Sequence, residues 1–596
     1  MTTLLTRDQV PSSDTWDLTP LYGSDAEWEL ALKELQSLIP EFARFRGTLG
    51  EVSALAECLA FDSRVDQICE RLGIYSYLKT TEDVAQSTYQ DMQGRLSKVL
   101  VRASEEASYI RPEIMAIDGE QMNQMLADDL LVPYRLLIER MRRYKPHTLS
   151  EKEEQILAMQ GEVSAAPGKI FRQLLDADMK FGHVKNEEGQ PIELTNATLM
   201  QLLISPKRSV RKKAFQQYYQ QFVGHENTLA ATLASSVQKD VFHARVRKYA
   251  SALDAALFAD DVPRSVYDNL ITAVHNKLPA LYRYYDIRRR KMKLKEIHHY
   301  DTYVPILSDI KTNYTWSQAV DTTLESLRPL GDEYCQVLAD GLHGRWCDRY
   351  PNKGKQSGAF SYGVYCAHPY IMMNYKPEVL DDMFTLTHEA GHAMHSYYSA
   401  RQQPFEYYNY VIFVAEVAST FNEQLLSHHL MKDAQDDQHR AYLINRDIDA
   451  IRGTIIRQTM FAEYEKLIHE MAEAGEALTA QSLKSTYRGL LQKYFGPDFA
   501  LDNELSLEGL RIPHFYRAFY VYKYATGLSA AIALSRGVLE GGNDALQRYL
   551  GFLHAGCSKM PLDILRDAGV DMSTPTPVET ALDHFESLVE QLAQAL

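Results

Sequence analysis

Hydrophobic and polar residues recur along most of the chain at the three- and four-residue spacing that is typical of amphipathic α-helices. Leu, Ile, Val and Tyr follow this spacing over residues 54–110 with few interruptions, which predicts an amphipathic helical hairpin. The same spacing continues over residues 114–159 and 209–223. Ser24 and Asp25 precede Ala-Glu-Trp-Glu-Leu at residues 26–30, and such polar residues followed by an early acid commonly begin a helix. We therefore predict a mainly α-helical fold.

The first interruption of the helical spacing lies at residues 181–194. Gly182, Gly189 and Pro191 fall within this stretch, and these residue types break helices and favour turns. A short hairpin or an ordered loop is therefore predicted here.

A second interruption lies between residues 354 and 375. Residues 354–362 are rich in glycine, and the aromatic and β-favouring residues 363–366 and 370–375 follow, with Pro369 between them. This pattern predicts two short antiparallel strands. A strand with a free edge can bind an extended peptide through main-chain hydrogen bonds. A sheet that only supports the following helix is an equally good interpretation.

The length of the chain indicates more than one lobe. Its 596 residues exceed what a single hydrophobic core usually organises. We place a boundary near Ser205 and Pro206, which divides the chain into an N-terminal helical lobe, residues 1–205, and a second domain, residues 206–596. The candidate chemistry described below lies in the second domain.

Composition and charge narrow the classes of function. The formal net charge of −16 argues against a general nucleic-acid binder, which needs a basic surface for phosphate contacts. No apolar run reaches the roughly 18 residues that a membrane span requires. Residues 1–22 lack the basic and apolar regions of a secretion signal. The six cysteines include no CxxC pair, which is typical of free thiols in a reducing compartment, so we expect a cytoplasmic location.

The strongest chemical pattern is the segment His-Glu-Ala-Gly-His at residues 388–392. On a helix, His388 and His392 lie one turn apart on the same face, so both imidazoles can bind one zinc ion. Glu389 then lies beside the open coordination position, where a carboxylate can take a proton from zinc-bound water and pass it to a leaving amine. The segment predicts a zinc hydrolase, and an accidental match to a short motif is the alternative.

The residues before this segment favour the zinc site over an accidental match. Pro377 suits the first turn of a helix, and Asp381 and Asp382 follow near the positive end of the helix dipole. Most of residues 379–386 are apolar, which predicts a buried helix. Buried histidines need polar partners, and a metal ion supplies them.

Glu416 is the preferred third zinc ligand. It lies 24 residues after His392, as an isolated acid within the largely apolar residues 411–423, which predict a second helix. A carboxylate in such surroundings is costly to bury unless it is paired or binds a metal. Glu423 falls two turns later on nearly the same face. It is either a partner that orients a ligand histidine or an exposed acid.

These residues resemble the M3 metallopeptidases. The segment His-Glu-Ala-Gly-His-Ala-Met-His at residues 388–395, together with Glu416 in Phe-Val-Ala-Glu-Val-Ala-Ser, is similar to that family, and more closely to its oligoendopeptidase F branch. The resemblance extends to residues 354–360 and 15–18, so it covers nearly the whole chain. It implies an all-helical, two-lobed ellipsoid with a deep substrate channel. It also implies zinc on the channel wall and internal cleavage of short peptides, with folded proteins excluded.

The resemblance further implies that a histidine and tyrosines near the C-terminal end stabilise the tetrahedral intermediate. His514 is the matching histidine. Tyr516, Tyr520 and Tyr524 follow one another at intervals of four residues, which predicts that they share one face of a helix. The hydrogen-bond donor stays open among Tyr520, Tyr522 and Tyr524, and aromatic packing in a core is the alternative for each.

The predicted mechanism combines these residues. His388, His392 and Glu416 hold one zinc ion per chain, with water at the fourth position. Glu389 is the general base, and His514 with one tyrosine stabilises the oxyanion. Metal polarisation and proton transfer suffice, so no covalent acyl-enzyme is needed.

Two other functions stay open at this point. A peptide-binding protein can keep zinc without catalysis, but Glu389 and an open fourth zinc position argue against it, because structural zinc sites are usually closed by four ligands. An exopeptidase needs a charged anchor for a peptide terminus, and the sequence shows none. The sequence does not determine the oligomeric state or the cleavage preference.

Overall fold

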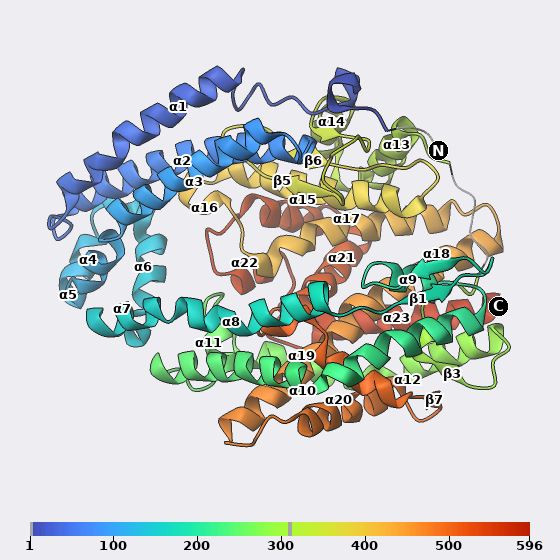
Figure 1. Cartoon of the computed structure of the whole chain (residues 1–596). Helices are drawn as coiled ribbons and strands as arrows, with labels where there is room; N and C mark the ends of the chain where they lie inside the picture. Colours follow the sequence, from blue (N-terminus) through green and yellow to red (C-terminus); the bar gives the residue numbers. More distant parts are fainter. Residues whose placement is uncertain (1–3, 308–312) are drawn as a thin grey trace. The chain divides into compact units, whose positions relative to one another are not determined.

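The computed structural model describes residues 4–307 and 313–596. Helices predominate in this part of the chain and the strands are short, as predicted (Figure 1). The residues form two compact units, each assembled from three segments of the chain. Unit 1 contains residues 1–146, 311–428 and 534–569, and unit 2 contains residues 147–310, 429–533 and 570–596. The two units are defined by contacts between residues, whereas the predicted boundary near residue 205 separates domains along the sequence. The division into residues 1–205 and 206–596 therefore stays a prediction.

Unit 1 holds the following helices and strands: α1 (Asp25–Leu38), α2 (Val52–Glu82), α3 (Ser87–Ala107), α4 (Ile110–Ala116), α5 (Gly119–Met125), α6 (Arg135–Arg143), α13 (Trp316–Ser326), α14 (Asp332–His343), β4 (Cys347–Asp348), β5 (Phe360–Tyr362), β6 (Tyr370–Met372), α15 (Leu380–Gln402), α16 (Phe405–Tyr408) and α22 (Pro561–Asp567). Two further helices contribute residues to both units: α17 (Ile412–Lys432) and α21 (Tyr522–His554).

Unit 2 holds the remaining helices and strands: α7 (Glu151–Met159), α8 (Gly161–Arg172), β1 (His183–Lys185), β2 (Pro191–Glu193), α9 (Thr198–Leu203), α10 (Arg208–Val246), α11 (Ala252–Phe258), α12 (Arg264–Lys291), β3 (Ile297–His298), α18 (Asp437–Ile451), α19 (Arg457–Glu473), α20 (Ala480–Phe495), β7 (Phe499–Ala500) and α23 (Thr576–Ala595).

The N-terminal helices of unit 1 confirm the predicted helical hairpin. α2 and α3 are its two arms, and α1 packs against both. α1 begins at Asp25, and the side chain of Ser24 accepts the backbone N–H of Glu27, as its residue type predicts. Trp28 of α1 is fully buried and donates its ring N–H to the carbonyl of Leu72 in α2 at 2.9 Å, which joins the two helices in one core.

The predicted pair of short strands also forms, with one correction of position. β5 and β6 pair antiparallel, with Phe360 opposite Met372, and β4 adds an unpredicted parallel strand on the other side of β6. The first strand, expected at residues 363–366, ends before Gly363. A Cβ at Gly363 would lie 2.4 Å from Oγ of Ser396 in α15, so the chain passes too close to this helix to continue in the sheet.

The predicted zinc helix is α15, and it begins later than expected. Its first residue is Leu380, so Pro377 lies outside the first turn where it was predicted. The cause is local, because Asp382 accepts the backbone N–H of Lys376 at 2.7 Å and the carbonyl of Lys376 accepts the N–H of Val379. These two hydrogen bonds fold the residues before Leu380 into a turn, so the helix begins after them. Most of the residues of α15 before and within the motif are buried, as predicted.

Unit 2 contains the predicted hairpin at residues 181–194. β1 and β2 pair antiparallel, with Val184 opposite Ile192, and Gly189 in the connecting turn has a φ of 81°. That backbone conformation is favourable for glycine and strained for other residues. A second, parallel pair joins β3 to β7.

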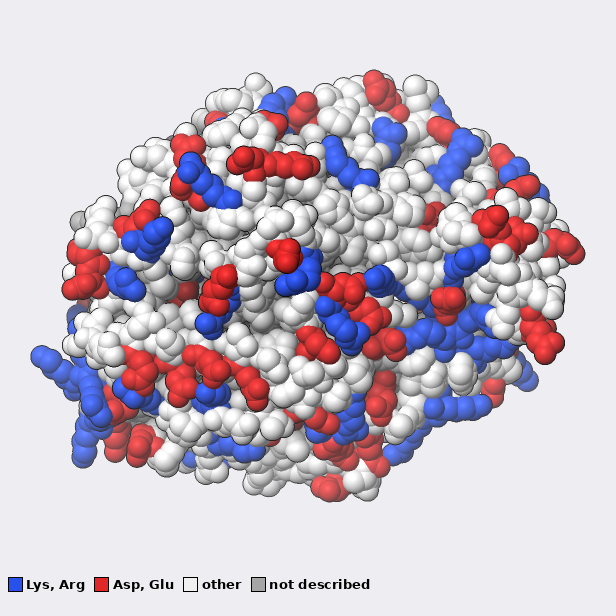
Figure 2. Space-filling view, turned by 180° about the vertical axis from the view of Figure 1, so that it is seen from behind, with Lys and Arg blue, Asp and Glu red and all other residues white. Residues whose placement is uncertain are grey.

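Three further features of the chain are the character of its helices, the state of its cysteines and the distribution of its surface charges. Among the described residues, no helix combines the length and the apolar character that crossing a membrane requires. None of the six cysteines forms a disulfide. Figure 2 shows Lys and Arg side chains interspersed with Asp and Glu over the face that it displays.

Candidate metal centre

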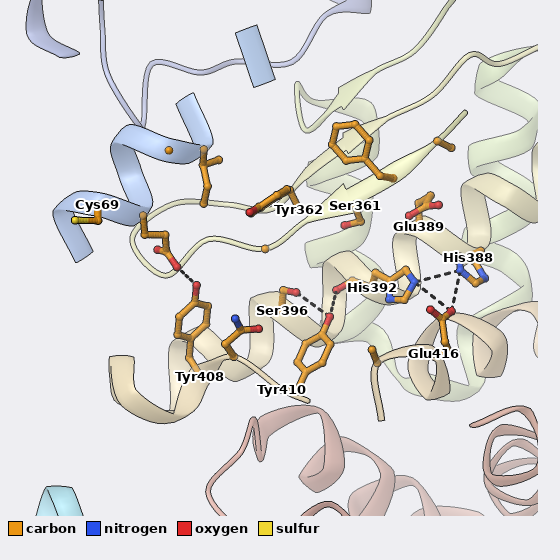
Figure 3. Close-up of a pocket in the computed structure, with 18 residues that line it drawn as sticks. Cys69, Ser361, Tyr362, His388, Glu389, His392, Ser396, Tyr408, Tyr410 and Glu416 are labelled. Carbon is orange, nitrogen blue, oxygen red and sulfur yellow. Dashed lines mark hydrogen bonds and ion pairs between the residues drawn. The ribbon is translucent and has the colours of Figure 1, made fainter. Parts of the chain in front are cut away.

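Three side chains of unit 1 converge on one point, and they are the three predicted zinc ligands. His388 and His392 come from consecutive turns of α15, and Glu416 comes from the start of α17. Nε2 of His388 lies 3.1 Å from Nε2 of His392 and 3.5 Å from Oε2 of Glu416. Nε2 of His392 lies 3.7 Å from the same Oε2. Figure 3 shows the three side chains facing one another.

The donor set and its spacing fit a zinc ion. Tetrahedral zinc binds imidazole nitrogen and carboxylate oxygen at about 2.0–2.2 Å, which places its ligand atoms about 3.3–3.6 Å apart. The three donor atoms form a triangle with sides of 3.1, 3.5 and 3.7 Å. Among the described residues the group contains three ligands, which is the number that catalytic zinc sites use.

Glu423 contacts His388, one of the three predicted ligands. Its Oε1 lies 2.7 Å from Nδ1 of His388. A proton on Nδ1 donated to this carboxylate leaves Nε2 with its lone pair directed at the metal position. Of the two interpretations of Glu423, the geometry therefore supports the partner that orients a histidine.

The electrostatics of the two histidines favour a bound cation. Burial lowers the pKa of His388, but the carboxylates of Glu416 and Glu423 outweigh burial and raise it to about 10. Burial and the neighbouring His388 lower the pKa of His392 to about 4. Glu416 and Glu423 thus stabilise positive charge at His388, and a metal ion that takes the place of the proton on Nε2 gains the same stabilisation.

Glu389 faces the same cavity, where its environment suits proton transfer. Its side chain is buried, and burial raises the pKa of Glu389 to about 7 even though His388 and a hydrogen bond from the backbone of Ser361 lower it. A carboxyl group with a pKa near neutrality can accept a proton and return it at pH 7.

The two ligand-bearing helices approach most closely at Gly391. A Cβ there would lie 2.6 Å from the carbonyl oxygen of Ala418 and 2.6 Å from Cα of Ser419, both in α17. Side chains essentially never make such short contacts, so only glycine allows this approach. The glycine of the motif thus lets α17 bring Glu416 within reach of the two histidines.

Tyr410 is a residue of this site that the sequence analysis missed. Its ring stacks on the buried His395, with 3.7 Å between ring centroids and 3° between planes. Its hydroxyl lies 3.0 Å from Oγ of Ser396 and donates to the carbonyl of His392 at 3.4 Å (Figure 3). These contacts hold the turn that carries His392. Tyr410 belongs to the loop before α17, where no spacing pattern could have identified it.

The metal centre opens into a cavity of about 740 Å³ in unit 1. The cavity is lined by α2, by β5 and its neighbouring residues, by α15, by the end of α16 with the loop that follows it, and by the first turns of α17. Its lining includes no Lys or Arg among the described residues. A cavity of this size has room for several residues of a peptide.

The predicted oxyanion residues lie in unit 2. The rings of His514, Tyr520 and Tyr524 form one cluster, with centroids 6.4 Å apart for His514 and each tyrosine and 5.3 Å apart for the two tyrosines. Tyr516 is hydrogen-bonded to α10, where its hydroxyl lies 2.7 Å from Oγ1 of Thr232. The role of the cluster in catalysis stays a prediction.

The tyrosines do not share one helix face, so that prediction is wrong. α21 begins only at Tyr522, and Tyr516 lies in a separate short 3₁₀ helix. Between them Phe519 has a φ of 57°, which a continuous right-handed helix does not allow. Its N–H is donated to the buried carboxyl group of Glu465 at 3.0 Å. A contact from a distant part of the chain therefore replaces the helical hydrogen bond.

Comparison with known families gives two matches. Residues 201–584 match the family described as Peptidase family M3, and residues 113–181 match the family described as Oligopeptidase F. The first match contains the metal centre, Glu389 and the His514 cluster.

Individual proteins are similar over nearly the whole chain. Oligopeptidase PepF of Bacillus subtilis is 41% identical over 99% of this chain and 88% of its own length. The plasmid-borne oligoendopeptidase F of Lactococcus lactis subsp. cremoris is 37% identical over 98% of each chain. The crystal structure of oligoendopeptidase-F from Enterococcus faecium is 33% identical and has a TM-score of 0.75 over 96% of this chain and 99% of that one. A crystal structure from Chlamydophila abortus is 34% identical and has a TM-score of 0.94 over the full length of both chains.

Proposed function

Because the chain belongs to peptidase family M3, we propose that it is a zinc-dependent endopeptidase that hydrolyses internal peptide bonds of short oligopeptides. The observation that carries this proposal is the convergence of His388, His392 and Glu416 beside Glu389 in one cavity. The Bacillus subtilis protein described above is named an oligopeptidase and the Lactococcus lactis protein an oligoendopeptidase, which supports the choice of short peptides as substrates.

The proposed zinc site is made of His388, His392 and Glu416, with one ion per chain and Glu423 as the partner of His388. A zinc ion there supplies Lewis acidity, which makes a water molecule more acidic and polarises a peptide carbonyl. The carboxylates of Glu416 and Glu423 supply negative charge on both sides of His388.

Glu389 moves the protons of the reaction. Its carboxylate accepts a proton from water as the water oxygen forms a bond to the scissile carbonyl carbon. It then gives that proton to the amide nitrogen as the C–N bond breaks, so that the amine leaves neutral. Burial raises the pKa of this carboxyl group, which favours both the acceptance and the return of the proton near neutral pH.

His514 and a tyrosine among Tyr520, Tyr522 and Tyr524 are proposed as donors to the oxyanion. The clustered rings of His514, Tyr520 and Tyr524 support this role. Burial, together with Arg172, lowers the pKa of His514, so its ring is a neutral donor at pH 7. Loss of one oxyanion donor typically costs about 3 kcal/mol of barrier.

β5 is proposed to bind the substrate backbone. It is the outer strand of its sheet, and its residues line the cavity beside Glu389. An extended peptide added to such an edge is held by main-chain hydrogen bonds, which depend little on side chains. This supports the substrate-binding interpretation of the sheet over a purely supporting one.

Three further proposals rest on the family resemblance and the composition. A deep channel admits short peptides and excludes folded proteins. The protein has no nucleic-acid or membrane partner, and it is located in the cytoplasm. The absence of disulfides among the six cysteines suits such a location.

Mass spectrometry of a peptide blocked at both ends tests the proposal. The protein is incubated with the peptide alone, with a chelator, and with the chelator followed by added zinc. We expect cleavage at an internal bond that stops with the chelator and returns with zinc. An intact peptide, in a sample whose metal analysis shows bound zinc, contradicts the proposal and favours a peptide-binding protein or an exopeptidase.

A further inference from the structure

We propose that Glu70 forms a subsite for a cationic group of the peptide substrate, either a Lys or Arg side chain or a free N-terminal ammonium group. The inference rests on the proposed function, because it assigns a specificity to the same cavity. It follows from the position of Glu70, its fixed orientation and its lack of a cationic partner.

The position of Glu70 links it to the metal centre. Glu70 lies on α2 and lines the same cavity as His388 and Glu416. Figure 3 shows this cavity from end to end, with Cys69 and Tyr408 at one end and the metal-binding side chains at the other. Strand β5 lies between the two ends and lines the middle of the cavity, with Tyr362 on the side toward Cys69. A peptide that pairs with β5 beside the metal centre and continues past Tyr362 runs toward Glu70.

The carboxyl group of Glu70 is held in a fixed orientation. Oε2 accepts the backbone N–H of Tyr365 at 3.1 Å, and Oε1 accepts the hydroxyl of the buried Tyr408. A carboxylate offers about four lone-pair positions, so two acceptor positions remain after these two bonds. A group held in place by two donors loses little conformational freedom when a third donor binds.

No cation of the protein pairs with this carboxyl group. The described lining of the cavity contains no Lys or Arg, and no ion pair of Glu70 within 4.0 Å exists among residues 4–307 and 313–596. The adjacent Arg71 donates to the carbonyl of Leu21 at 2.6 Å and lies over the ring of Tyr22, 4.8 Å from its centroid. Its guanidinium group is thus engaged on the N-terminal segment.

A half-buried carboxylate without a cationic partner is unfavourable, and this is why a cation should bind to Glu70. Burial raises the pKa of Glu70 to about 7, and Asp66 raises it as well, although the bond from Tyr365 lowers it. A cationic group in contact with the carboxylate supplies the missing countercharge and a charge-assisted hydrogen bond. A neutral side chain of the same size supplies neither, so the site should distinguish the two.

A set of matched peptides tests this subsite. The parent is a neutral peptide blocked at both ends, and each member carries Lys or norleucine at one position along the sequence. The quantity compared is the ratio of kcat/KM for the Lys peptide to that for its norleucine partner. In wild type we expect this ratio to reach about tenfold at one position, which corresponds to one charge-assisted hydrogen bond.

The Glu70→Gln variant removes the charge. Its amide oxygen can still accept the N–H of Tyr365, and its NH2 group can donate to the hydroxyl oxygen of Tyr408. We expect the ratio to fall to about one in this variant. The matched control is Glu57→Gln, an exposed residue on the same helix, which should keep the wild-type ratio. A third arm compares the neutral peptide with a free and with an acetylated N-terminus. A preference for the free amine that disappears in Glu70→Gln identifies the ammonium group as the ligand.

Two outcomes overturn the proposal. One is a wild-type ratio near one at every position and no preference for the free amine. The other is a Glu70→Gln variant that keeps the wild-type ratio, whatever its absolute activity, because Glu70 then only fastens Tyr365 and Tyr408. Calorimetric titration of the same peptides separates this test from the proposed function. If no peptide is cleaved, a binding preference for Lys that is lost in Glu70→Gln still supports the subsite, and equal binding by both proteins overturns it.

Discussion

His388 lies between two carboxylates, one at each ring nitrogen. Oε1 of Glu423 lies 2.7 Å from Nδ1, and Oε2 of Glu416 lies 3.5 Å from Nε2. The first contact fixes the orientation of the ring, and the second belongs to the metal position. A single residue thus connects the two ligand-bearing helices electrostatically.

The Glu423→Gln variant should bind zinc about 10–100-fold more weakly than wild type. A neutral amide accepts the Nδ1 proton less strongly than a carboxylate does, so it orients the ring less well and makes Nε2 less basic. Competition with a chromophoric chelator measures the affinity, with Glu57→Gln as the exposed control. An unchanged zinc affinity shows that Glu423 has no orienting role.

The Glu389→Gln variant should retain zinc and lose turnover. Gln cannot accept and return a proton, and general acid–base catalysis contributes about 10²–10⁴-fold, so kcat should fall by at least about 10²-fold. Metal analysis and cleavage of the blocked peptide are measured on the same preparation. Turnover near the wild-type rate rules out the proposed role of Glu389.

At the scale of elements, the separation of α15 and α17 decides whether the site exists. Their backbones meet at Gly391, where an added Cβ has no free space next to Ala418 and Ser419. Gly391 lies between the two ligand histidines in the chain, so any increase in the separation of the helices also moves Glu416 away from them.

The Gly391→Ala variant should be destabilised by about 1–3 kcal/mol, because the clash is with backbone atoms that cannot move aside. The better helix propensity of Ala, about 1 kcal/mol, offsets only part of this cost. Zinc affinity should fall as well. Chemical denaturation and zinc titration measure both effects.

Gly94→Ala is the matched control for this substitution. Gly94 lies inside α3, and a Cβ there would meet nothing within 4 Å. We expect Gly94→Ala to leave the zinc affinity unchanged and to stabilise the protein by up to about 1 kcal/mol. A Gly391→Ala variant as stable as Gly94→Ala would refute the close-contact argument.

The segment around Phe519 shows how an element can depart from its local preference. The spacing of the tyrosines favours one helix, but Phe519 takes a left-handed conformation and donates its N–H to Glu465. Glu465 is buried, and burial holds the pKa of its carboxyl group well above the usual range. The chain therefore bends between His514 and α21. This bend allows the rings of His514, Tyr520 and Tyr524 to cluster.

At the scale of the whole molecule, buried ionisable groups make stability depend on pH. His299 of unit 2 is 4% exposed, and its Nε2 lies 3.3 Å from the hydroxyl of Tyr303. Burial lowers the pKa of His299 to about 3, below the value of about 6.5 expected in the unfolded chain. The unfolded state thus binds more protons than the folded state, so the stability from this group is present above pH 6.5 and is lost as the pH falls toward 3.

Between pH 7 and pH 4 this loss should amount to about 3 kcal/mol. The His299→Gln variant lacks the titration, so its Tm should fall less than that of wild type over the same interval. Calorimetry of both proteins across this pH range gives the comparison. Parallel Tm curves for the two proteins show that His299 does not contribute.

Much of the fold and the metal centre follows from local rules, and the sequence predicts those parts. Helices are marked by their own spacing of apolar residues, and two histidines four residues apart must share a helix face wherever the helix packs. Glu416 is identifiable because a lone acid in an apolar helix needs a partner. These residues were all predicted, and the structure brings them together.

The remaining features depend on contacts between residues far apart in the chain, and only the tertiary structure decides them. Glu70 meets Tyr408 across 338 positions, and Glu465 meets Phe519 across 54. Such hydrogen bonds leave no periodic pattern in the sequence, yet each is strong enough in a buried site to orient a side chain or to stop a helix. The sequence alone therefore determines most of the helices and the side chains that can hold a metal. The packing of distant segments decides which other groups face the cavity and where α21 begins.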